Sequence, residues 1–170
     1  MKASIKVIAI ANQKGGVGKT TTAVNLTAGL GLKGKKTLLV DIDPQGNSTS
    51  GFGINKKEVA ASSYEFIMGI KPAAEVIIHT KFKGVDTIPS AMDLAGAEIE
   101  LTATEDREVQ LKRALSFVRE QYDYILIDCP PSLGLISLNA MTAADTFLVP
   151  IQCEYFALEG LSQLMSTMRQ

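Results

Sequence analysis

The feature that most constrains the fold of this chain is a glycine-rich run near its N-terminus, QKGGVGKT at residues 13–20. An apolar stretch, VIAIA at residues 7–11, precedes the run, and a segment with helically spaced apolar residues follows it. A strand, a glycine loop and a helix in this order form a phosphate-binding loop, in which successive backbone N–H groups hold phosphates at the helix N-terminus. The chain is therefore predicted to bind a nucleoside triphosphate.

The residues of this loop have separate predicted roles. Those expected to contact the nucleotide are Gly15, Gly16, Val17, Gly18, Lys19, Thr20 and Thr21. Lys19 is expected to neutralise the β- and γ-phosphates, and the Thr20 hydroxyl to ligate Mg²⁺. The strict pattern G-x-x-x-x-G-K-[ST] fails at its first glycine, where the chain has Gln13, and a second lysine, Lys14, follows. A purely structural turn is the alternative, but the three threonines at residues 20–22 are poor helix formers and favour a site that needs hydroxyl groups.

Composition places the chain among ordinary globular proteins. Its 170 residues, 46% hydrophobic and 21% charged, suit one domain. The net charge of −1 indicates no overall preference for nucleic acid, and the lysine clusters at residues 33–36 and 81–83 are read as solvated segments that could still form local contacts. Cys129 and Cys153 are too few for a disulfide framework. No signal peptide or membrane-spanning apolar run is visible, so a reducing cytoplasm is expected.

Strand-like and helix-like segments alternate along the chain. Strands are expected at residues 5–11, 37–42, 84–88, 124–128 and 146–151. Helices are expected at residues 20–32, 60–68, 93–102, 107–120, 135–143 and 158–168. This alternation predicts an α/β fold with three layers: a doubly wound, mostly parallel sheet, helices on both faces, and a phosphate site at the carboxyl ends of the strands. Residues 1–170 are predicted to form a single P-loop domain that is truncated at its C-terminal end, because the last helix shows no stop signal.

Three aspartates end two of the expected strands. The run LLVDIDPQGN carries Asp41 and Asp43, and the run YILIDCPP carries Asp128. A carboxylate at the tip of a buried strand needs a cation or hydrogen bonds to compensate it, and beside a phosphate loop the natural cation is hydrated Mg²⁺. The predicted metal site is Thr20, Asp43 and Asp128, and Asp43 is also expected to orient the attacking water. Asp41 is either a more distant Mg²⁺ contact or a turn and cap residue. The segment 130–134, with two prolines and a glycine hinge, is read as a switch that senses the γ-phosphate.

Several motifs carry a family resemblance. The runs KGGVGKT, DIDPQGN and IDCPPS, at residues 14–20, 41–47 and 127–132, resemble the nucleotide-site motifs of the ParA, Soj and MinD group of ATPases. The runs IPSAMDLAGAE and EYFALEGL, at residues 88–98 and 154–161, resemble the Soj and ParA chromosome-partition branch. The resemblance covers essentially the whole chain. Members of this group are longer, and their C-terminal part carries the adenine contacts and most of the basic DNA-binding surface.

The resemblance implies an ATP-dependent, dimerising switch ATPase of DNA partitioning, with ATP and Mg²⁺ as cofactors and slow, partner-stimulated hydrolysis. In such proteins ATP binding brings two subunits face to face. Lys14 would act across that interface on the phosphates of the second subunit, comparable to an arginine finger. The implied catalytic residues are Lys14, Lys19 and Asp43. The implied partners are a second copy of the chain, non-specific DNA and a ParB-like stimulatory protein, with no stable membrane insertion and a cytoplasmic, nucleoid-associated location.

Four other functions fit the same residues less well. A MinD-like, membrane-associated ATPase needs a terminal amphipathic, basic helix, which the sequence does not show. An electron-transfer protein of the nitrogenase iron-protein type needs two cysteines per subunit that converge on a cluster, and the positions of Cys129 and Cys153 do not favour one. A signalling GTPase needs a guanine-recognition motif after a late strand, and NKKE at residues 55–58 lies too early. A shortened nucleotide-binding homologue without turnover is the remaining alternative.

Overall fold

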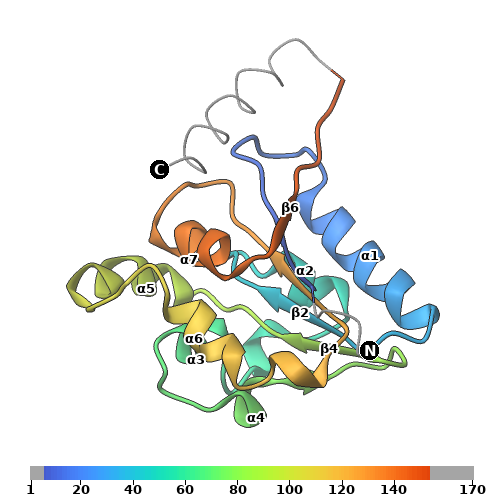
Figure 1. The fold of residues 1–170 in the computed structure, drawn as a ribbon, viewed down its shortest axis with the longest axis horizontal. Coiled ribbons are helices and arrows are strands. Elements are labelled where there is room, and N and C mark those ends of the chain that lie inside the picture. The colour runs from blue at the N-terminus through green and yellow to red at the C-terminus, as the bar shows by residue number, and fades with distance from the viewer. Residues whose placement is uncertain (1–5, 154–170) are drawn as a thin grey trace.

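The computed structural model describes residues 6–153, and the strands in this part of the chain form one six-stranded sheet (Figure 1). The strands are β1 (Lys6–Ile10), β2 (Thr37–Asp41), β3 (Ile78–His79), β4 (Val85–Ile88), β5 (Tyr124–Asp128) and β6 (Thr146–Leu148). Their order across the sheet is β3-β4-β2-β5-β1-β6, and every pair is parallel except β3 with β4. Parallel neighbours require crossover connections, which helices supply here. The predicted doubly wound, mostly parallel fold is confirmed.

Helices cover both faces of this sheet (Figure 1). The α-helices are α1 (Lys19–Leu32), α2 (Asn47–Gly51), α3 (Ser63–Ile67), α4 (Ala73–Val76), α5 (Leu94–Glu100), α6 (Gln110–Ser116) and α7 (Leu135–Ala143). Short 3-10 turns lie at Lys56–Glu58, Leu101–Ala103 and Arg119–Gln121. None of the helices in residues 6–153 is both long and apolar enough to span a bilayer.

The two faces of the sheet bury different sets of side chains. In β2, Leu38 and Val40 belong to the larger apolar cluster, which packs against α3, α5, α6 and α7. Leu39, between them, belongs to the smaller cluster under α1 and the end of α2. All three side chains are fully buried, because a strand inside a parallel sheet is covered on both faces. The three-layer arrangement is therefore confirmed.

The sequence predictions differ from the structure mainly at the ends of helices and strands and in the short elements between them. The predicted helix 107–120 is α6 followed by a 3-10 turn, and the predicted helix 60–68 is the shorter α3, which begins at a capping box of Ser62 and Glu65. The predicted strand 146–151 ends at Leu148, shortly before Pro150, which has no N–H to continue a ladder. The short elements β3, α2 and α4 were not predicted, since they carry no periodic apolar pattern. The helix predicted at 158–168, the motif at 154–161 and residue 5 lie outside the described residues.

Candidate nucleotide-binding site

The glycine loop joins the end of β1 to the start of α1, at the carboxyl edge of the sheet (Figure 1). Gly16 and Gly18 have φ angles of 75° and 92°, in the left-handed region that glycine adopts without strain. The first turn of α1 follows at once, and its backbone N–H groups have no partners within the helix. A cavity of about 360 Å³, here called the nucleotide cavity, opens at this point. Its lining residues are Gly15, Gly16, Gly18, Lys19, Thr20, Thr21, Asp43, Gln45, Asn47 and Pro131.

Lys19 lies at the base of the nucleotide cavity and is buried, with 8% of its surface exposed. Its Nζ donates a hydrogen bond to the backbone carbonyl of Lys14 at 3.1 Å. Burial lowers the pKa of Lys19, and the carboxylates of Asp128 and Asp43 oppose that shift. An anionic phosphate in the cavity would likewise favour the charged amine.

Asp128 is the last residue of β5, and its buried carboxylate lacks hydrogen-bond partners. Neither of its oxygens accepts a hydrogen bond of standard geometry, and the residue is 1% exposed. The pKa of Asp128 is raised to about 7, mainly by burial and to a smaller extent by the charge of Asp41. The nearby hydroxyls of Thr20 and Ser48 act in the opposite direction. A buried carboxylate without partners is costly unless a cation compensates it. Asp128 with Thr20 therefore fits a hydrated Mg²⁺.

The donor set decides what kind of metal site this is. Within residues 6–153, no three His, Cys, Asp or Glu side chains gather in a way that could hold a metal ion. Mg²⁺ usually keeps several waters and binds one or two protein oxygens together with substrate phosphates. The site therefore fits a metal that arrives with a nucleotide rather than one held by the protein alone.

Asp41 pairs with Asp128 across the β2–β5 register but has a different environment. Its Oδ2 accepts hydrogen bonds from the backbone N–H of Thr49 at 2.8 Å and from the Thr49 hydroxyl at 2.6 Å. Its Oδ1 accepts one from the backbone N–H of Asp43 at 3.2 Å. Burial raises its pKa, and the bonds from Thr49 oppose that shift. Of the two roles considered for Asp41, the structure favours the turn and cap role, because Oδ2 holds the first turn of α2 and Oδ1 holds the turn that precedes it.

Asp43 lies just beyond the end of β2 and lines the nucleotide cavity together with the glycine loop. Its Oδ1 accepts a hydrogen bond from the backbone N–H of Gln45 at 2.9 Å, which fixes the turn that leads into α2. The residue is 9% exposed. The predicted switch segment reaches the same cavity through Pro131. The structure thus brings Lys19, Thr20, Asp43 and Asp128 together at one edge of the sheet.

Asn12 was not among the predicted site residues, yet it holds the loop in place. It is 6% exposed, its Nδ2 donates to the backbone carbonyl of Pro150 at 2.8 Å, and its Oδ1 accepts the backbone N–H of Lys14 at 3.0 Å. Gln152 Nε2 also donates to the carbonyl of Gly16, at 3.1 Å. The segment after β6 is therefore tied to the glycine loop at two points. The one sequence signal was a polar residue directly after an apolar strand.

Replacing Asn12 with alanine is expected to weaken ATP binding by on the order of tenfold, because two partly buried backbone groups lose their partner and each net hydrogen bond contributes about 1 kcal/mol. The Asn12→Asp variant keeps the acceptor for Lys14 but loses the donor to Pro150, and an intermediate affinity is expected. Isothermal titration with Mg·ATP measures both, with Asn55→Ala on an exposed turn as the control. Unchanged affinity in Asn12→Ala would exclude this positioning role.

Comparison with known proteins agrees with this geometry. A family model described as an AAA domain matches residues 5–170. The chain belongs to this family. The sporulation initiation inhibitor protein Soj of Bacillus subtilis is 58% identical over 164 residues, which cover 96% of this chain and 65% of that protein. The chromosome partitioning protein ParA of Myxococcus xanthus is 52% identical over 162 residues, which cover 95% of this chain and 57% of that protein.

Solved structures show the same fold. The crystal structure of cobyrinic acid a,c-diamide synthase from Mycobacterium smegmatis, with a bound ATP analog and magnesium, matches with a TM-score of 0.93 and 42% identity. The match covers 97% of this chain and 67% of that one. This chain spans about three fifths of the length of the two curated relatives. The predicted resemblance to Soj and ParA proteins and the predicted P-loop fold are both confirmed.

Proposed function

We propose that this chain is the nucleotide-binding part of a ParA/Soj-type switch ATPase, which hydrolyses ATP to ADP and phosphate in DNA partitioning. The observation that carries the proposal is the pairing of a buried amine, Lys19, with a buried carboxylate without hydrogen bonds, Asp128, beside a glycine loop. The amine can bind an anion and the carboxylate can face a cation, and Mg·ATP supplies both. The similarity to proteins named Soj and ParA supports the biological role.

In this proposal each site residue has a chemical task. The backbone N–H groups from Gly15 to Thr21 and the amine of Lys19 would bind the phosphates of ATP. Thr20, with Asp43 and Asp128 through water, would hold Mg²⁺, which when bound neutralises charge on the phosphate oxygens. Asp43 would orient the attacking water, because its turn holds the carboxylate at the cavity wall. Phosphoryl transfer depends mainly on such positioning and charge stabilisation.

The proposal extends to the oligomer and its partners. ATP would bring two copies together through their nucleotide faces, and Lys14 would reach the phosphates of the second subunit. The backbone N–H of Lys14 donates to the Asn12 side chain, and its carbonyl accepts from the Lys19 amine. Such a fixed backbone fits a residue whose side chain must reach a defined position. Residues 1–170 would act as a single domain. Non-specific DNA and a ParB-like protein would be partners of a cytoplasmic, nucleoid-associated protein whose slow hydrolysis the partner stimulates.

The oligomeric state of the chain with ADP and with an ATP analog tests this function directly. Multi-angle light scattering of the purified chain is expected to give a monomer with ADP and a dimer with a slowly hydrolysed ATP analog and Mg²⁺. Single-turnover phosphate release on the same preparation measures hydrolysis. A chain that binds ATP but neither dimerises nor releases phosphate would contradict the switch and favour a nucleotide-binding homologue without turnover.

The Lys14→Ala variant is expected to stay monomeric with the ATP analog, while its affinity for ATP changes by only a few-fold. The physical reason is that a charge supplied to the second subunit stabilises the dimer and not the monomer. Light scattering with and without the analog is the measurement, and Lys112→Ala, which removes an exposed lysine of α6, is the matched control. An ATP-induced dimer of Lys14→Ala would show that Lys14 does not act across the interface.

A further inference from the structure

Glu98, in helix α5, contacts the part of the chain that follows Asp128. Its Oε1 accepts a hydrogen bond from the backbone N–H of Leu135, the first residue of α7, at 2.7 Å. A Cβ atom placed on Gly134 would overlap the same carboxylate oxygen, so the carboxylate lies directly against the backbone of Gly134. Two observations of different kinds therefore place Glu98 at the start of α7.

The start of α7 has no cap of its own. Its N-cap residue is Gly134, which offers no side chain, and its first turn contains no acidic residue. The first backbone N–H groups of a helix have no partners within the helix, and this end favours a negative charge. Glu98 supplies an acceptor and a carboxylate from a different helix. In the same turn of α7, the Ser137 hydroxyl donates to the backbone carbonyl of Ser132 at 2.5 Å, which joins the helix to the segment before it.

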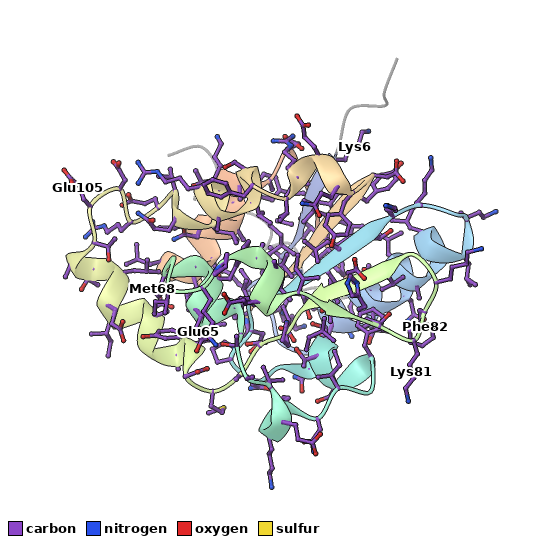
Figure 2. The ribbon with its side chains drawn as sticks, turned by 90° about the horizontal axis from the view of Figure 1, so that it is seen from below. Lys6, Glu65, Met68, Lys81, Phe82 and Glu105 are labelled. Carbon is purple, nitrogen blue, oxygen red and sulfur yellow. The ribbon has the colours of Figure 1, made fainter. Side chains whose placement is uncertain are left out.

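The helix that carries this carboxylate is a fixed support. In α5, Leu94 and Ala97 are fully buried in the larger apolar cluster. The Tyr64 hydroxyl of α3 donates to the Glu100 carboxylate of α5 at 3.0 Å. The two helices contact each other, and Figure 2 shows Met68, the residue that ends α3, beside the ribbon of α5. The position of the contact with α7 is therefore set by the packed core.

The predicted switch segment, residues 130–134, is thus held at both of its ends. Before it, the backbone N–H of Cys129 donates to the carbonyl of Ile10 in β1 at 3.2 Å. After it, the contact with Glu98 fixes the start of α7. Between these two points, Pro131 lines the nucleotide cavity. The position of Pro131 at the cavity therefore depends on a carboxylate that does not line the cavity itself.

We propose that Glu98 is a positioning residue for ATP hydrolysis, which acts through the N–H of Leu135 to hold the switch segment at the nucleotide cavity. Phosphoryl transfer depends mainly on the placement of groups around the phosphates. A loosened switch segment should therefore lower the rate of hydrolysis more than the affinity for ATP. The effect on hydrolysis rests on the proposed function, whereas the hold on the segment rests on the fold.

The Glu98→Ala variant is expected to release phosphate on the order of tenfold more slowly in a single turnover, because a hydrogen bond to a carboxylate is lost, while the affinity for ATP changes less than about twofold. Glu98→Gln keeps an acceptor for the N–H of Leu135 and should restore the rate to within about threefold of that of the unmodified chain. The matched control is Glu100→Ala, which removes an exposed carboxylate from the same helix and should leave both quantities unchanged.

The Gly134→Ala variant disturbs the same contact from the other side. Gly134 has a φ of −80°, which alanine adopts without strain, but the added Cβ would displace the Glu98 carboxylate. The expected loss of rate equals that of Glu98→Ala. The double variant should be no slower than either single variant, because all three remove one shared contact. Additive losses would show that the two residues act separately and would contradict the proposal.

Hydrogen exchange of residues 129–138, measured by mass spectrometry with and without an ATP analog, gives a readout that needs no turnover. Glu98→Ala and Gly134→Ala should exchange faster in this segment, Glu98→Gln should resemble the unmodified chain, and residues 19–32 should be unchanged, which excludes general unfolding.

Unchanged exchange and unchanged phosphate release in Glu98→Ala would overturn the proposal. Faster exchange with unchanged release would also overturn it, because Glu98 would then only cap a helix. An unmodified chain that binds ATP but releases no phosphate would reject the proposed function, and the exchange data alone would then decide whether Glu98 holds the switch segment.

Discussion

Replacing Asp43 with alanine is expected to lower the rate of ATP hydrolysis at least about 100-fold, while the affinity for ATP changes only a few-fold. A loss of this size is in the range that a positioned carboxylate contributes to proton transfer. Asp43 lines the nucleotide cavity together with the glycine loop, and its carboxylate accepts a hydrogen bond from the backbone N–H of Gln45. The phosphate contacts come from the glycine loop and Lys19, which the substitution does not touch. Binding should therefore persist while the attacking water loses its orientation.

Two further variants make this result specific. Asp43→Asn keeps an oxygen that can accept the Gln45 N–H but removes the negative charge. It therefore distinguishes the effect of a disrupted turn from the effect of losing the carboxylate that orients the water. Glu105→Ala removes an exposed carboxylate that does not line the cavity, and it controls for net charge. Phosphate release in a single turnover is the measurement, together with titration of ATP. Unchanged release from Asp43→Ala would remove Asp43 from the catalytic residues.

The Asp128→Asn variant is expected to make the nucleotide-free protein more stable, by on the order of 2–4 kcal/mol above neutral pH, because a shift of one pKa unit corresponds to about 1.4 kcal/mol. Burial and the charge of Asp41 raise the pKa of Asp128 from 3.8 to about 7. Ionised Asp128 is therefore a cost to the folded state that asparagine removes. The same substitution should abolish the added stability that Mg²⁺ gives in the presence of ATP. Urea unfolding with and without Mg·ATP measures both effects.

The pH dependence follows from the direction of this shift. Below pH 4 the carboxyl group is protonated in both states and costs nothing. Between about pH 4 and 7 the unfolded chain loses the proton while the folded protein keeps it, so the folded state loses stability as pH rises. The difference in stability between Asp128→Asn and the unmodified chain should grow over this range and level off above it. A difference that does not change between pH 5 and 8 would contradict the assigned shift.

Most of the fold could be predicted because its signals are local. The buried strands β1, β2 and β5 appear in the sequence as continuous apolar runs, and α7 was predicted with its observed ends. The glycine loop was recognisable because Gly16 and Gly18 occupy backbone conformations that other residues avoid. Short elements such as α2 and β3 could not be predicted, because they depend on partners distant in sequence. Asp41, for example, holds α2 through Thr49, whose hydroxyl also accepts the N–H of Ser90 at 2.9 Å.

The sequence by itself determined that this chain has a phosphate loop, a buried parallel sheet and carboxylates at the strand ends. Each of these features depends on residues that are neighbours along the chain. Tertiary structure alone decided which carboxylate lacks partners, because the β2–β5 register sets Asp128 beside Asp41 and only Asp41 is capped by Thr49. It also joined Asn12 to Pro150 across 138 residues and set a carboxylate of α5 at the start of α7. These relations depend on the strand order β3-β4-β2-β5-β1-β6, which arises from packing between distant segments and leaves no local pattern.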